Sequence, residues 1–83
     1  MLKHIDFVIY CLEEFRSAKK LTGRQVIAVF DKYRVYDFIE NSYDALHTFS
    51  GDEIAWNISR YMQHYRRHNE SGPTRRNPAA SSP

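Results

Sequence analysis

Apolar residues recur at helical spacing along two adjacent stretches in the middle of the chain, within residues 21–48. Side chains at positions i, i+3, i+4 and i+7 share one face of a helix, so each stretch predicts a short amphipathic helix. Only Lys32, Tyr33 and Arg34 are available to join the two helices, which must therefore run antiparallel or cross sharply. The apolar stripes are Val26, Val29, Phe30 and Tyr33 in the first helix and Val35, Phe38, Ile39, Ser42 and Leu46 in the second.

One further helix is predicted on each side of this central pair. Residues 2–19 are apolar over so much of the helix circumference that this helix must be central in the fold or covered by another surface. Residues 51–67 carry a narrower stripe and end in basic residues, which suit a helix C-terminus. The expected core positions are Leu2, Ile5, Phe7, Val8, Ile9, Cys11, Leu12 and Phe15 in the first helix and Ile54, Ala55, Ile58, Tyr61, Met62 and Tyr65 in the last.

Two short sequences mark helix starts. Thr22 with Gln25 and Ser50 with Glu53 have the spacing of a capping box, in which each side chain bonds the backbone N–H of the other residue. We therefore expect four helices, at about residues 2–19, 22–33, 35–47 and 51–67. The predicted fold class is all-α, a small four-helix bundle-like domain.

The last fifteen residues, 69–83, have a different composition from the rest of the chain. They contain all three prolines and no large apolar side chain. Such a segment cannot bury enough surface to offset the entropy that ordering it would cost. We predict a helical domain over residues 1–68 and a disordered tail rich in Pro, Ser and Arg over residues 69–83.

Composition narrows the class of protein. A chain of 83 residues suits one domain with a modest core. Cys11 is the only cysteine, which excludes an intrachain disulfide and a thiolate-based metal site, and we expect it to be a small buried hydrophobe. With no signal peptide and no apolar run of about 18 residues, the chain is expected to be cytoplasmic and to have no membrane partner.

No residue pattern indicates catalysis or a cofactor. Gly23, Gly51 and Gly72 are too widely spaced for a phosphate-binding loop. His64 and His68 share one helix face at a spacing that can hold a metal ion, but no acid or thiol nearby completes the ligand set. We predict that the protein is not an enzyme and has no cofactor or metal site.

The central helix pair has the outline of a helix-turn-helix, but its second helix carries Asp37, Glu40 and Asp44. Carboxylates repel DNA phosphates, so sequence reading by this helix is not expected. A nucleic-acid-associated regulator is the alternative function that the sequence leaves open. It would contact the phosphate backbone through the basic residues near the C-terminus, which are Arg60, Arg66, Arg67, Arg75 and Arg76.

A family resemblance is carried by Leu21, Thr22, Gly23, Val26, Phe30, Tyr33, Val35, Ile39, Tyr43, Leu46, His47 and Thr48. This pattern resembles a family of short, uncharacterised bacterial proteins, a domain of unknown function, over about residues 3–66. Family members are often encoded beside a protein resembling an ADP-ribosyltransferase toxin, which implies an antitoxin-like or accessory role. Glycine is common in the family at the position of Arg34, where a left-handed turn residue would be expected.

The sequence favours a protein-binding module with exposed aromatic surface, because tyrosine combines a large contact area with few rotors and a polar tip. The partner would be another protein, such as the ADP-ribosyltransferase-like toxin, or a second copy in a homodimer. Two alternatives stay open, namely that the acidic residues only face solvent and that His47 only caps a helix end. The candidate partner-binding residues are Phe7, Tyr10, Tyr36, Asp37, Glu40, Tyr43, Asp44 and His47.

Overall fold

The computed structural model describes residues 2–70, with side chains up to residue 68. Within that range the chain forms five helices and no strand, which confirms the predicted all-α fold. The helices are α1 (Ile5–Lys19), α2 (Gly23–Lys32), α3 (Val35–Asn41), α4 (Tyr43–Leu46) and α5 (Gly51–Glu70).

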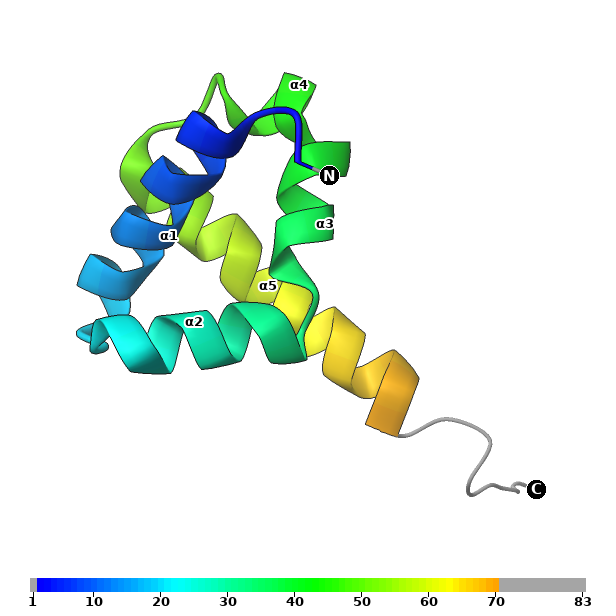
Figure 1. The fold of residues 1–83 in the computed structure, drawn as a ribbon. Coiled ribbons are helices and arrows are strands. Elements are labelled where there is room, and N and C mark those ends of the chain that lie inside the picture. The colour runs from blue at the N-terminus through cyan, green and yellow to red at the C-terminus, as the bar shows by residue number, and fades with distance from the viewer. Residues whose placement is uncertain (1, 71–83) are drawn as a thin grey trace.

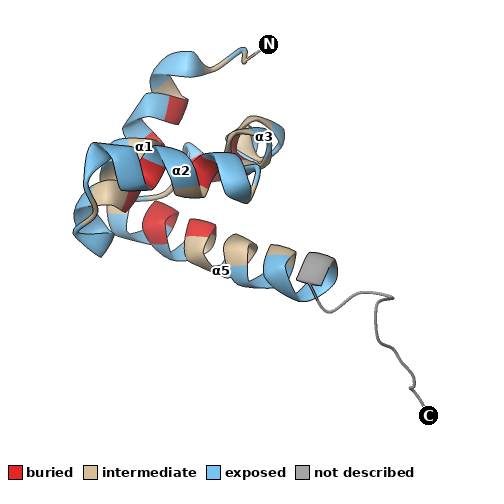
Figure 2. Ribbon diagram, turned by 60° about the horizontal axis from the view of Figure 1, so that its bottom comes forward, coloured by how far each residue is buried: buried red, intermediate tan, exposed pale blue. Residues whose placement is uncertain are grey.

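The helices surround one core to which each of them contributes. α1 packs most extensively against α5 and also contacts α2 and α3. α3 leaves the end of α2 at a sharp angle, as the short connection predicts, and α5 extends beyond the other helices (Figure 1). The buried positions face one another across the interior (Figure 2) and are Val8, Cys11, Phe15, Val26, Phe30, Val35, Ile39, Leu46, Ile54, Ala55 and Ile58.

The first helix differs from the prediction at its start and on one flank. It begins at Ile5 rather than near residue 2: His4 has the non-helical φ of −115° and ψ of 54° at the N-cap position, and its backbone N–H donates to Glu40 on α3. Ile5 and Ile9 were expected in the core but are 50% and 52% exposed. The ~100° step per residue places both on a flank turned away from Val8 and its buried neighbours.

The predicted third helix, residues 35–47, is wrong as a single element because it breaks at Ser42 into α3 and α4. The N–H of Ser42 donates to the carbonyls of Phe38 and Ile39, at 3.0 and 3.2 Å, which closes α3. Its carbonyl accepts from the N–H groups of Ala45 and Leu46, at 3.1 and 2.9 Å, which opens α4. All four bonds are made by the Ser42 backbone, and its side chain forms no cap hydrogen bond to α4.

Helix starts and turns follow the local sequence closely. Both capping boxes are confirmed, with side-chain to backbone bonds in each direction at Thr22–Gln25 and Ser50–Glu53. α1 ends in a Schellman motif, in which the N–H of Leu21 bonds the carbonyl of Arg16 at 2.9 Å. Arg34 has φ 55° and ψ 42°, so the turn between α2 and α3 is left-handed without a glycine.

The last helix runs further than expected. α5 continues to Glu70 instead of ending near residue 67, so it enters the segment assigned to the tail. The predicted disorder of residues 71–83 lies outside the described residues. No helix in residues 2–70 has both the length and the apolar composition that crossing a membrane requires.

Candidate functional site

Five ring-bearing side chains gather where the start of α1 meets α4, and we call this surface the ring patch: His4, Phe7, Tyr10, Tyr43 and His47. The Tyr43 ring stacks on both imidazoles, with centroids 3.7 Å from His4 and 4.7 Å from His47 and planes within 10° of parallel. Phe7 meets Tyr43 edge-on at 5.2 Å, and Tyr10 lies 6.0 Å from Phe7. The His4–Tyr43 pair is closer than the about 4.5–7 Å that aromatic pairs favour, and the other three separations lie within this range.

The N-terminal side of the ring patch is fastened to α3 through one carboxylate. The backbone N–H of His4 donates to Glu40 Oε2 at 2.8 Å, and His4 Nδ1 lies 2.9 Å from Glu40 Oε1. Loss of hydration raises the pKa of Glu40, but the hydrogen bonds from His4 and from the Lys3 backbone outweigh it, so this pKa lies below its ordinary value. An ionised Glu40 therefore holds His4 in place against Tyr43.

The C-terminal side of the ring patch is set by the end of α4. The carbonyl of Tyr43 accepts from His47 Nδ1 at 2.8 Å, and the carbonyl of Ala45 accepts from Thr48 Oγ1 at 2.8 Å. These bonds confirm the predicted capping role of His47. They also fix the imidazole in its position against the Tyr43 ring.

The ring patch is open to solvent on its outer side. Tyr10 is 43% exposed, and Ile5 and Ile9 are exposed on the same helix. A shallow hollow of about 310 Å³, lined by Lys3, His4, Ile5, Asp6, Phe7 and Tyr43, lies against the stack. Flat rings with apolar neighbours and a few acids form a surface that can hold apolar or cationic groups of a partner.

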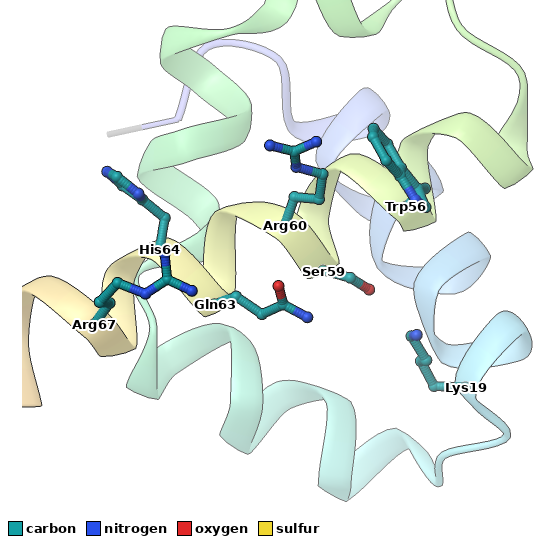
Figure 3. Close-up of a pocket in the computed structure, with 7 residues that line it drawn as sticks. All are labelled: Lys19, Trp56, Ser59, Arg60, Gln63, His64 and Arg67. Carbon is teal, nitrogen blue, oxygen red and sulfur yellow. The ribbon is translucent and has the colours of Figure 1, made fainter.

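A second surface, which we call the cationic groove, lies between the end of α1 and the outer face of α5. It encloses about 510 Å³, and Figure 3 shows Lys19 reaching toward it from α1 while the other side chains project from α5. Trp56, Arg60, Gln63 and Arg67 recur at i, i+4, i+7 and i+11 and so form one row along α5. The lining residues are Lys19, Trp56, Ser59, Arg60, Gln63, His64 and Arg67.

The positive charges of the cationic groove are not neutralised within the part of the chain that the structure describes. No carboxylate from residues 2–68 lines the groove, and Lys19, Arg60 and Arg67 form no ion pair there. The Arg60 guanidinium lies 4.9 Å from the centre of the Trp56 ring, a cation–π contact. Trp56 is nevertheless 58% exposed.

A family model described as a protein of unknown function, DUF3791, matches residues 6–64. The chain belongs to the DUF3791 family. No curated protein and no solved structure matches it.

The DUF3791 match extends from the first turn of α1 well into α5 and covers most of both surfaces. It includes every member of the ring patch except His4 and every member of the cationic groove except Arg67. The resemblance to a domain of unknown function is thereby confirmed.

The structure of this DUF3791 protein brings together five of the predicted partner-binding residues, namely Phe7, Tyr10, Glu40, Tyr43 and His47. Their role in binding stays a prediction.

Of these five, Glu40 contacts the ring patch through His4 without being a member of it, and the other three predicted partner-binding residues are not members either. Tyr36 packs edge-on against Phe30 at 5.5 Å, and Asp37 is paired with Arg34 at 2.7 Å. Asp44 is exposed in the first turn of α4. The three carboxylates therefore do not lie on one continuous helix, because the break at Ser42 separates Asp44 from Asp37 and Glu40, which already bind Arg34 and His4. Their role in partner binding stays a prediction.

The predicted basic residues divide between two neighbouring surfaces. Arg60 and Arg67 line the cationic groove, and Arg66 lines an adjoining hollow. Arg75 and Arg76 lie outside the described residues.

Several residues of these surfaces were not predicted from the sequence, among them His4, Lys19 and Trp56. The sequence around His4 does not indicate its role, because its partners Glu40 and Tyr43 are distant along the chain. Lys19 is likewise placed only by the packing of α1 on α5. Trp56, in contrast, shares a helix face with Arg60 and Arg67, a spacing that the sequence contains.

The histidines and the thiol form no metal-binding cluster in the described region. No group of three His, Cys, Asp or Glu side chains among residues 2–68 lies close enough to hold a metal ion, and the rings of His64 and His68 meet edge to face at 4.2 Å. Cys11 is fully buried, as predicted. Burial and the nearby Glu14 carboxylate raise the pKa of Cys11 to about 12, which leaves the thiol protonated.

Proposed function

We propose that this DUF3791 protein works by binding another protein through the ring patch. The observation that carries the proposal is the open stack of rings on Tyr43, with exposed Tyr10 at its rim. None of these side chains belongs to the fully buried core, to which all five helices contribute, although Phe7 packs against its edge. Rings held in a fixed arrangement lose little entropy on binding, so they make efficient anchors.

The charges around the ring patch favour a partner that presents arginine or lysine side chains. The hollow beside the patch is lined by Asp6 and by one cation, Lys3. Glu40 is held ionised by His4, and Asp44 is exposed next to Tyr43 in sequence, so carboxylates outnumber lysine and arginine side chains here. A guanidinium group can stack on a tyrosine ring while it pairs with a neighbouring carboxylate.

The family resemblance supplies a candidate partner, the ADP-ribosyltransferase-like protein that is often encoded beside family members. Binding would make this protein antitoxin-like or accessory, because covering the partner's active cleft or holding one of its loops would block its activity. A second copy of this chain is the competing occupant of the same surface.

The test is co-expression of the full chain with an ADP-ribosyltransferase-like protein of the kind often encoded beside family members, followed by size-exclusion chromatography with light scattering. We expect a complex that the Tyr10→Arg and Tyr43→Ala variants weaken at least tenfold, about 1.4 kcal/mol or more. Ile27→Ala is the matched control, because Ile27 is 49% exposed on α2, outside the ring patch.

Two outcomes would contradict the proposal. One is a protein that stays monomeric alone and forms no complex with its neighbour. The other is a complex that the Tyr10→Arg variant leaves unchanged although circular dichroism shows a native helical content. If the protein instead self-associates and Tyr10→Arg abolishes this self-association, the partner at this surface is a second copy of the chain and not a different protein.

A further inference from the structure

We propose that the cationic groove binds single-stranded nucleic acid, with Trp56 stacking on a base and Lys19, Arg60 and Arg67 contacting phosphates. This surface is distinct from the ring patch, since the two share no residue. The inference does not depend on the proposed protein partner.

The arrangement of the groove fits an extended strand. Trp56, Arg60, Gln63 and Arg67 lie along one face of α5, and a rise of about 1.5 Å per residue makes this row roughly 16 Å long. Lys19 approaches from α1 on the other side of the groove (Figure 3). An aromatic platform at one end and cations along the row are the two components of sequence-tolerant strand binding.

Trp56 is the feature that favours a nucleobase over a simple anion. An exposed tryptophan costs hydration free energy and contributes nothing to the core, yet 58% of this side chain faces solvent. The Arg60 contact at 4.9 Å orients the indole and brings a guanidinium beside any base that stacks there. An acidic peptide would use the cations but would have no π surface to place on the indole.

The charge balance of the groove favours a polyanion. Lys19, Arg60 and Arg67 lack carboxylate partners within residues 2–68, so a bound strand would displace counterions instead of breaking ion pairs. Ser59 and Gln63 add hydrogen-bonding groups to the lining, suited to phosphate or base edges.

The test is a titration of the full chain with fluorescein-labelled oligothymidine and oligouridine of equal length, read by anisotropy at low salt. Trp56 is the only tryptophan of the chain, so quenching of its emission by the unlabelled strands reports stacking directly. We expect the anisotropy increase and the quenching of tryptophan emission to saturate at the same strand-to-protein ratio. With three phosphate contacts, the log of the affinity should fall with the log of the salt concentration with a slope of about −2.

Variants separate stacking from charge. Trp56→Ala should weaken binding at least about fivefold, and Arg67→Gln should make the salt slope about 0.7 shallower. Arg24→Gln is the matched control, because Arg24 is an exposed arginine on α2 that does not line the groove. Tyr10→Arg, which tests the ring patch, should leave strand binding unchanged, so the two proposals fail separately.

Three results would overturn the inference. The first is the absence of binding at low salt, and the second is unchanged affinity in Trp56→Ala. The third is that poly-glutamate quenches Trp56 and competes as well as the oligonucleotides do, which would make the groove a general anion-binding surface. Tighter binding of oligouridine would assign RNA as the ligand, and tighter binding of oligothymidine would assign DNA. Either of these supports the proposal.

Discussion

Lys20 and Arg34 hold left-handed backbone conformations, with φ of 56° and 55°, that glycine would adopt with less strain. Lys20 closes the Schellman motif at the end of α1, and its N–H bonds the carbonyl of Ser17 at 3.2 Å. Arg34 has a compensating contact, because its guanidinium is paired with Asp37. The two strained positions therefore differ in what a substitution would remove.

Lys20→Gly should stabilise the protein by about 1 kcal/mol, because it relieves left-handed strain without loss of a side-chain contact. Arg34→Gly should stabilise the protein by a smaller amount, since it also removes the ion pair with Asp37. Urea unfolding followed by circular dichroism measures both changes. Lys19→Gly is the control, and it should destabilise by up to about 1 kcal/mol, because it puts a poor helix former at the last residue of α1 and removes the Lys19 contact with the Phe15 ring. Destabilisation by Lys20→Gly would contradict this account.

Glu40 should make stability depend on pH on the acid side. Its pKa is lower in the folded protein than in the unfolded chain, so the unfolded state binds more protons in acid. The stabilisation is present above the unfolded pKa and is lost as the pH falls through the folded pKa. Thermal melts between about pH 6 and pH 3 should therefore show a shallower decline for Glu40→Gln than for the wild type, though from a lower starting value. If the melting temperatures of Glu40→Gln and the wild type fall in parallel with pH, ionised Glu40 does not contribute this pH-dependent stability.

Residue-level features were predictable where the interaction is local. Thr22 with Gln25 and His47 with the Tyr43 carbonyl involve residues three or four positions apart, so spacing alone identifies them. The His4–Glu40 contact joins residues 36 positions apart, and nothing in the local pattern indicates it.

At the level of elements, apolar periodicity predicted where helices form but not where one of them breaks. The stripe from Val35 to Leu46 continues at helical spacing across Ser42, because both α3 and α4 point their apolar residues into one core. The break depends on Ser42 backbone bonds that a residue pattern does not encode. The position of this break matters for the candidate site, because Tyr43 is the first residue of α4 and its ring stacks on His4.

The Tyr61 hydroxyl links α5 to the turn between α2 and α3. It donates to the carbonyl of Tyr33 at 2.7 Å and lies 3.2 Å from the carbonyl of Arg34. Tyr61→Phe should therefore cost about 1 kcal/mol of unfolding free energy, because it leaves a turn carbonyl without this donor. Chemical denaturation measures the change, with Tyr10→Phe as the control at an exposed tyrosine. An equal effect of the two variants would contradict the assignment.

At the level of the whole molecule, the fold class followed from the sequence, whereas the exposed surface did not. α1 is apolar around much of its circumference, and the sequence alone could not say which flank its neighbours cover. The packing of α1 on α5 and α3 leaves Ile5 and Ile9 uncovered and turns Phe7 toward Tyr43. In the same way, only the docking of α1 on α5 places Lys19 across from Trp56.

The single thiol of this protein lies sealed in its interior, and it should react only when the domain opens. Cys11 is 0% exposed, so an alkylating reagent in native buffer should modify it at the rate set by transient opening, and in denaturant at once. Mass spectrometry of timed samples measures this; rapid labelling in native buffer would show that α1 detaches on its own.

The alkylation rate of the buried Cys11 thiol can therefore also be used to measure ligand binding. A molecule that associates only with the closed form lowers the population of the open form and slows alkylation by the factor 1 + [L]/Kd. A protein partner and a nucleic acid strand could thus each be detected, and their affinities ranked, by the lifetime of one unmodified side chain.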